Sequence, residues 1–132
     1  MFGLDVIVDS RMQRVEELAE RAQFRNFGHA SARISKDAKA SIVTSSDPSP
    51  PGSPPHTRAQ RGHNLRGAIR YASDQDGAII GPMKSIVGDV GQAHEFGGRF
   101  RGEDFERRPF MGPALERNLD RFADDWEGSI GE

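Results

Sequence analysis

The longest regular pattern of apolar residues lies in the first third of the chain. Apolar residues recur there at helical spacing and mark one face of a helix: Val15, Ala19, Ala22, Ala30, Ile34, Ala38 and Ile42. Asp9 or Ser10 is the expected N-cap. Because the face is narrow and rich in alanine, we expect this long helix to lie close against a sheet or a second helix. Gly28 lies within the pattern and lowers the stability of a helix by about 1 kcal/mol relative to alanine, which favours a bend there.

The residues before this helix follow a different pattern. Leu4, Val6 and Val8 occupy alternate positions, which is typical of a β-strand. We therefore expect residues 1–9 to form an edge strand or an ordered N-terminal arm.

A second helical pattern lies near the C-terminus. Gly112 is the expected N-cap and Pro113 the first helical residue. Four apolar residues then recur at helical spacing, namely Leu115, Leu119, Phe122 and Trp126. We expect this stripe to be buried and Gly128 to end the helix.

The central part of the chain predicts short elements. A helical turn is expected at 65–69, followed by strands at 69–73 and 78–80 that flank the Asp76-Gly77 turn. Residues 83–91 show little periodicity and are expected to form a loop. A short helix is expected at 90–96, ended by Gly97-Gly98, and a further strand begins near Phe100. The fold class is therefore α+β in a single domain spanning 1–132, with the long N-terminal helix packed on a small antiparallel sheet.

The segment 45–55 holds five of the eight prolines in the chain. Proline-rich sequence cannot continue a helix and favours the stiff polyproline II conformation. We expect a Pro-rich loop at 45–58 that projects from the body. Such a segment is also typical of SH3-domain ligands, so an adaptor that binds a protein partner through it is the alternative function.

Composition and charge favour an oligomer. Only 35% of residues are apolar and 29% are charged, with a formal net charge of −2, which leaves surfaces for a partner to complete. Four arginines and no carboxylate lie in 48–73, whereas six acids and two arginines lie in 116–132. The two regions could pair within a subunit, pair between neighbours, or remain separate solvated surfaces.

The sequence offers no pattern for catalysis, a cofactor or a metal. The chain has no cysteine, and His94-Glu95 lacks the second histidine of a zinc protease because position 98 is glycine. His29, His56 and His63 have no ligand spacing. Glu103, Asp104 and Glu106 lie among arginines, which favours a solvated loop. No apolar run is long enough for a signal peptide or a membrane span, and no pattern for sequence-specific nucleic-acid recognition occurs.

Three blocks carry a resemblance to a known family. They are Pro50-Pro-Gly-Ser-Pro-Pro-His-Thr-Arg with Leu65-Arg-Gly-Ala-Ile-Arg-Tyr, then Gly81-Pro with His94-Glu-Phe-Gly-Gly, then Arg108-Pro-Phe-Met-Gly-Pro-Ala-Leu-Glu. In this order they resemble the head–tail joining and tail-completion proteins of tailed phages and prophages, a family of virion morphogenesis or minor tail components. The resemblance covers residues 10–126.

The resemblance implies a structural virion protein, made in the cytoplasm of the host bacterium. Members assemble into a ring, frequently six-fold, at the neck between the portal and the tail tube, and DNA passes through the bore. The implied partners are further copies of the chain and the other neck and tail-tube proteins. The family has no catalytic residues to transfer.

If the chain forms a ring, particular side chains are expected at subunit contacts. Candidates are Pro50, Pro51, Arg58, Arg66, Arg70, Phe100, Phe105, Phe110 and Met111. For Phe110, burial in the core is an equally good alternative.

Overall fold

The computed structural model describes residues 2–58, 64–127 and 129, and only the backbone of residues 2–11. The elements are α1 (Phe2–Ser41), α2 (Leu65–Ala68), β1 (Ile69–Ser73), β2 (Ala78–Pro82), α3 (Lys84–Val87), α4 (Val90–Phe96), β3 (Gly98–Phe100), β4 (Glu103–Phe105) and α5 (Met111–Trp126). The expected α+β class is confirmed, with a long N-terminal helix, small antiparallel sheets and a C-terminal helix.

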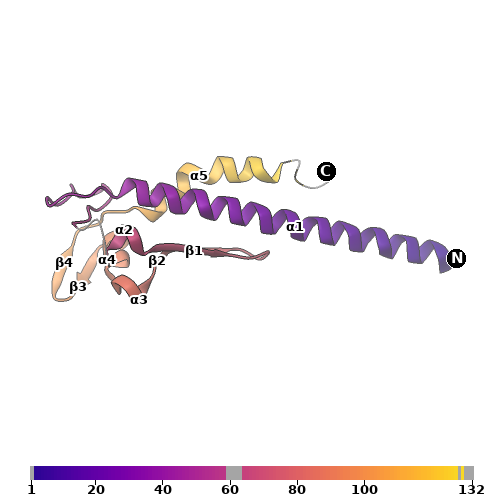
Figure 1. The fold of residues 1–132 in the computed structure, drawn as a ribbon, viewed down its shortest axis with the longest axis horizontal. Coiled ribbons are helices and arrows are strands. Elements are labelled where there is room, and N and C mark those ends of the chain that lie inside the picture. The colour runs from indigo at the N-terminus through magenta and orange to yellow at the C-terminus, as the bar shows by residue number, and fades with distance from the viewer. Residues whose placement is uncertain (1, 59–63, 128, 130–132) are drawn as a thin grey trace.

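Helix α1 is the longest of the described elements. It has 40 residues, so it is about 60 Å long at 1.5 Å per residue. Its C-terminal half packs against α5 and against the β1–β2 hairpin. Its N-terminal half extends beyond these elements (Figure 1).

Two predictions about the start of α1 are wrong. The backbone of residues 2–9 is helical, so there is no N-terminal strand, and neither Asp9 nor Ser10 is an N-cap. A strand needs a neighbour to satisfy its backbone hydrogen bonds, whereas a helix satisfies most of its own. The helix also passes through Gly28 without interruption.

The expected buried face of α1 is confirmed only in its C-terminal half. Five members of that face are buried: Ala22, Ala30, Ile34, Ala38 and Ile42. Val15, in the N-terminal half of α1, is exposed.

The core lies where α1, α2, β1 and the start of α5 meet. Its larger members are Ile34, Ile42, Leu65, Ile69 and Phe110. Its area is limited, since many of the other buried side chains are alanine or small polar residues.

Both hairpins form separate two-stranded antiparallel sheets. In the first, Ile69 pairs with Pro82 and Ser73 with Ala78, as the sequence predicts apart from two additional residues in β2. The turn is held by Asp74 Oδ1, which accepts hydrogen bonds from the backbone N–H groups of Asp76 and Gly77 at 2.7 and 3.1 Å.

Residues 83–91 are not the expected loop. They contain α3 and the start of α4, separated by Gly88 at φ 63°. Such short helical turns bury too few apolar residues to leave a periodic pattern in the sequence.

Helix α5 also differs from the prediction. It begins at Met111, so Gly112 and Pro113 lie inside its first turn. Its buried residues are Ala114 and Asn118, whereas Leu115 and Leu119 remain 47% and 48% exposed. The expected end at Gly128 lies outside the described residues.

The contact between α5 and α1 has a polar seam and an aromatic end. Asn118 Nδ2 donates to Asp37 Oδ2 at 2.8 Å, and Arg33 pairs with Asp125. The rings of Phe122 and Trp126 lie 5.7 and 6.0 Å from that of Phe27. The aromatic half of the apolar stripe of α5 therefore packs against α1, whereas Leu115 and Leu119 stay at the surface.

Candidate interface surfaces and the junction between them

The three sequence blocks meet at the start of α5. Glu95, near the end of α4, accepts hydrogen bonds at 2.9 Å from the backbone N–H groups of Phe110, Met111 and Gly112. These groups have no partner within their own helix, and the N-cap Phe110 has no side-chain acceptor to offer. A carboxylate at the positive end of the helix dipole therefore joins α4 to α5.

The Pro-rich loop is fastened to the segment before α5. Gly52 N donates to Arg107 O at 2.8 Å, and Arg108 Nε donates to Ser49 O at 2.9 Å. Pro55 is also buried. The loop extends from the C-terminal end of α1 (Figure 1), but these bonds hold it to the body.

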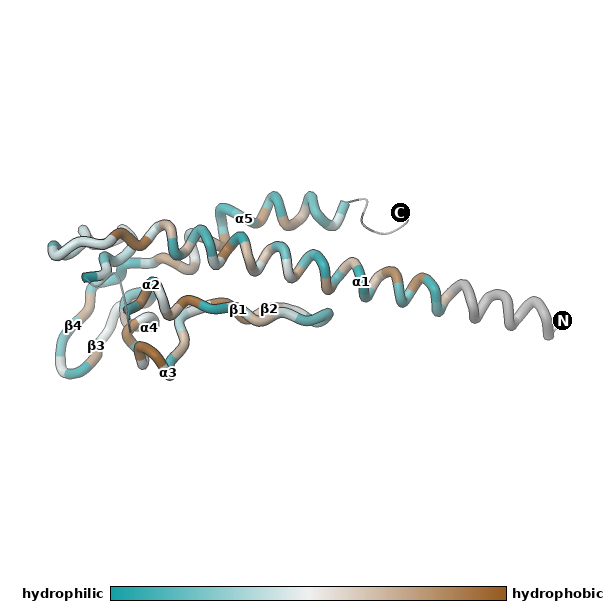
Figure 2. The backbone as a smooth tube through the Cα atoms, viewed as in Figure 1, coloured by the Kyte–Doolittle hydropathy of each residue, from teal (hydrophilic) through white to brown (hydrophobic). Residues whose placement is uncertain are grey.

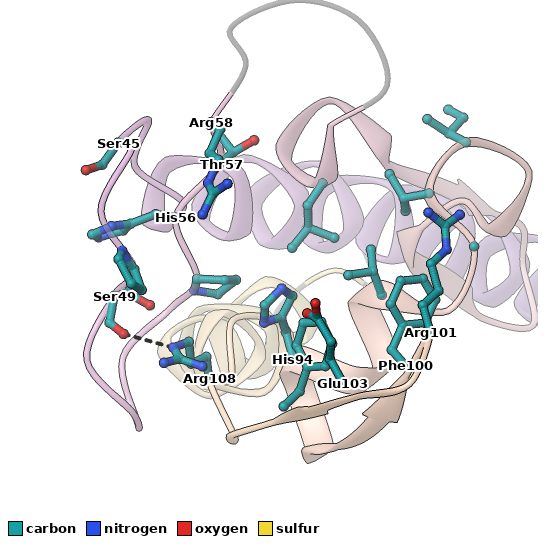
Figure 3. Close-up of a pocket in the computed structure, with 18 of the residues that line it drawn as sticks. Ser45, Ser49, His56, Thr57, Arg58, His94, Phe100, Arg101, Glu103 and Arg108 are labelled. Carbon is teal, nitrogen blue, oxygen red and sulfur yellow. Dashed lines mark hydrogen bonds between the residues drawn. The ribbon is translucent and has the colours of Figure 1, made fainter.

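An open cavity of about 1050 Å³ lies between this loop and the β3–β4 hairpin. Figure 3 shows His94 and Arg108 on one side of it and Arg58 on another. The charged lining residues are Arg58, Lys84, Arg101 and Arg108, with Asp47, Glu103 and Asp104. Because the two signs are mixed, the cavity favours neither an anionic nor a cationic ligand.

His94 is held in the wall of the cavity by packing. Its ring lies edge-on to Phe105 at 5.1 Å, and its buried Nδ1 has no hydrogen-bond partner among the described residues. Burial, and then the positive charge of Arg108, lowers the pKa of His94 below its usual 6.5. The neutral ring is therefore the form that the fold accommodates.

The expected interface residues lie in different parts of the molecule. Phe110 belongs to the core and is not a surface residue. Phe100 and Phe105 are half-buried, and their rings meet edge to face with centroids 5.9 Å apart in the second hairpin. Met111 is also half-buried and packs against the core.

The proline and arginine candidates are all exposed, namely Pro50, Pro51, Arg58, Arg66 and Arg70. Arg61 lies outside the described residues, as does His63. Asp125 pairs with Arg33 of α1 and not with an arginine of the basic middle region. Pairing between the two charged regions across subunits stays a prediction.

One uncovered apolar surface lies on the N-terminal half of α1. Met12 and Val15, one turn apart on the same face, are 61% and 58% exposed. Figure 2 shows apolar positions on this part of the helix, beyond the elements that cover its other half.

A second uncovered apolar surface is a groove of about 570 Å³ between β2, α4 and α5. Ile34 and Phe110 are among its lining residues, as are Ile80, Pro82, Met111 and Leu115. At its edge Phe96 is 71% exposed. We call this the α4–α5 groove.

Sequence reasoning missed the polar residues that join the elements. Asn118 lies between Leu115 and Leu119 in the apolar pattern of α5 and was not singled out from the sequence. A polar residue in that position can indicate a specific contact. Glu95 was considered only as a metal ligand. The signal for its actual position is a helix that begins without a capping side chain of its own.

Within the described ranges, no group of three or more histidine or acidic side chains is placed to hold a metal ion. No described helix combines the length and apolarity needed to cross a bilayer. No protein-family model, curated protein or solved structure matches this chain.

Proposed function

We propose that this chain is a structural subunit of the neck of a tailed phage. Copies of it assemble into a ring at the head–tail junction, where the ring joins or completes the tail and lets DNA pass. The virion neck is then its location, after synthesis in the host bacterium. The proposal assigns no catalytic step to the chain.

The observation that carries the proposal is the presence of two separate apolar surfaces on one copy. The exposed half of α1 and the α4–α5 groove lie on different parts of the molecule. Contiguous exposed apolar surface marks interaction sites. Two different patches on each copy suit a head-to-tail contact, which closes into a ring when the rotation between neighbours permits.

The convergence of the sequence blocks supports the same proposal. The blocks that resemble the phage family meet through Glu95, Arg108 and the Pro-rich loop. Their bonds connect backbone segments and build a junction between elements. This arrangement is what a structural protein requires, and it accounts for the blocks without a reaction.

The charge of the chain is compatible with a DNA-conducting bore. A formal net charge of −2 gives no strong general attraction to phosphate. DNA would then pass through the ring without sequence-specific binding. The neighbouring layers of the ring would be the other neck and tail-tube proteins.

Light scattering of the purified protein over a range of concentrations tests the proposal. We expect a discrete species with a mass several-fold that of the 14.5 kDa chain, and annular particles in negative-stain electron micrographs. A strict monomer at every concentration would contradict self-assembly into a ring. It would favour the alternative, an adaptor that binds a protein partner through the Pro-rich loop.

A further inference from the structure

We infer that the N-terminal half of α1 from one copy lies in the α4–α5 groove of the next copy. This inference rests on the proposed ring and names the contact that builds it. It makes a second copy of this chain the occupant of the groove.

The exposed half of α1 has the pattern of a helix that needs a partner. Met12, Val15 and Ala19 follow each other at i, i+3 and i+7, with Leu18 beside them. The sequence carries the same spacing back to Val8 and Leu4. An isolated helical segment of this kind is marginal in water, because most helix stability comes from packing an apolar face.

The groove has the complementary character. Its lining is mainly apolar, with Ile80 and Pro82 from β2 and Met111 and Leu115 from α5. Leu119 continues the exposed apolar line of Leu115 along α5. A groove between a strand and a helix, with apolar side chains along it, is the kind of surface that receives an amphipathic helix.

A single copy cannot place its own α1 terminus in its own groove. Ile34, which lines the groove, belongs to the same uninterrupted helix as Met12. The two residues are therefore about 33 Å apart along the axis at 1.5 Å per residue. In Figure 1 the N-terminus points away from α4 and from the start of α5. The occupant must come from another copy.

Charge along the two surfaces is complementary. Helical spacing puts Arg14, Arg21 and Arg25 along one edge of the apolar stripe of α1, and all three are exposed. On α5, the exposed acids Glu116 and Asp120 lie on the edge next to Leu115 and Leu119. The arginine edge of the incoming helix can therefore lie along the acidic edge of the groove.

Glu16 and Glu20 lie on the other side of the α1 stripe and are exposed. On the other wall of the groove, Lys84 already pairs at 3.1 Å with Asp89, which also lines the groove. This pair has no net charge, so the arginine edge of α1 is the one that meets an opposite charge. Rim charges of this kind fix register and orientation more than they add affinity.

Site-directed crosslinking of the full-length chain tests the contact, because the natural sequence has no cysteine. One batch carries Met12→Cys, Val15→Cys or Ala19→Cys in turn, and a second batch with a different tag carries Leu115→Cys. The two are mixed and oxidised, and the crosslinked species are resolved by mass. Arg121→Cys replaces Leu115→Cys as the matched control, since helical spacing places it on the other side of α5.

We expect at least one of the α1 cysteines to crosslink to position 115 several-fold more than to position 121. Crosslinks mainly between two α1 cysteines, or between two copies of position 115, would overturn the inference. An assembled ring without any crosslink between α1 and position 115 would overturn it while leaving the proposed function intact. A monomer at every concentration would overturn both.

A second measurement does not depend on disulfide geometry. Val15→Asp and Leu115→Asp, each at an exposed position, should both convert the assembly to a monomer whose folded body still unfolds cooperatively in urea. Glu17→Asp, on the other side of α1, should leave the mass of the assembly unchanged. Retention of the full assembly in both variants would overturn the inference.

Discussion

Glu95 shows how one side chain can organise a junction. A carboxylate has two oxygens, and here they accept three backbone N–H groups at the start of α5. Each bond is charge-assisted, and the first turn of α5 has no acidic residue of its own. Glu95 thus replaces the N-cap that the sequence of α5 lacks.

Removing this carboxylate should loosen α5. Glu95→Ala is expected to lower the free energy of unfolding by about 1–3 kcal/mol, because three donors lose their acceptor. Glu95→Gln keeps one acceptor oxygen and should therefore lower the free energy of unfolding by a smaller amount. Urea denaturation followed by circular dichroism measures both. Glu106→Ala, at an exposed position beyond β4, is the control, and an equal loss in that variant would argue against the capping role.

Burial of His94 should make the stability of the fold sensitive to acid. Its pKa is lowered in the folded state, chiefly by burial, so below pH 6.5 the unfolded chain binds more protons than the folded one. The free energy of unfolding should therefore fall as the pH drops from about 6.5 towards the lower folded pKa. The stability lost in acid is fully present at pH values above the pKa that His94 has in the unfolded chain.

The measurement compares urea midpoints at pH 7.5 and 5.5. His94→Gln does not titrate in this range and should show a smaller difference between the two midpoints than the natural chain. His29→Gln, on the exposed side of α1, should keep the original difference. If His94→Gln keeps it too, His94 is not the source of the acid sensitivity.

At the scale of elements, the sequence predicted what local chemistry determines. Asp74 and Gly77 make a turn by bonds within a few residues, so the β1–β2 hairpin was predictable. The end of α4 at Gly97, with φ 75°, follows from the freedom of glycine in that region. The first turns of α1 were not predictable, because Leu4, Val6 and Val8 suit a strand as well as a helix.

The face of α5 was mispredicted for a different reason. Its apolar stripe is the strongest helical signal in the chain, and Phe122 and Trp126 do pack against Phe27 of α1, yet Leu115 and Leu119 remain 47% and 48% exposed. Periodicity identifies the side of a helix that needs cover but does not say what covers it. An uncovered stripe in one copy is the expected result when the cover belongs to another copy.

Two glycines test how tightly the elements pack. At Gly28 a Cβ would meet only Ser73 Oγ at 3.8 Å, an ordinary contact. Gly28→Ala should therefore raise the free energy of unfolding by about 0.5–1 kcal/mol, because alanine favours the helix. Thermal unfolding measures this gain, and a loss would show that α1 needs the flexibility of glycine at this point.

Gly91 should give the opposite result. A Cβ there would lie 2.4 Å from Cγ of Pro82 and 3.4 Å from Leu65. Neither the proline ring nor the surrounding core can move aside easily. Gly91→Ala should therefore lower the free energy of unfolding by about 1–3 kcal/mol through overpacking. The same unfolding assay applies, with Gly28→Ala as the matched substitution in a helix.

At the scale of the whole molecule, the core is small and the outer surfaces are incompletely covered. Composition alone indicated this, because only 35% of the residues are apolar. It could not indicate which apolar residues remain outside. That depends on the direction in which α1 leaves the body and on how α5 packs against α1, which leaves Leu115 and Leu119 at the surface.

Added salt should weaken the association of copies more than it lowers the stability of each copy. Raising the salt concentration from about 0.1 M to about 1 M shortens the screening length from about 10 Å to about 3 Å. If the arginine edge of α1 lies along Glu116 and Asp120, association should weaken over this range. The urea midpoint of the isolated chain should change less, since its core is apolar.

Charge reversal identifies the residues responsible for that salt effect. Arg14→Glu with Arg21→Glu should weaken association at low salt by at least tenfold, because each new carboxylate would face the acidic edge of α5. Glu116→Arg with Asp120→Arg in the partner copy should restore it, as measured by light scattering of mixed variants. Arg117→Glu, on the other side of α5, is the control and should not affect association. Failure of the restoring pair, with association otherwise intact, would mean that the arginines of α1 contact a different part of the neighbouring copy.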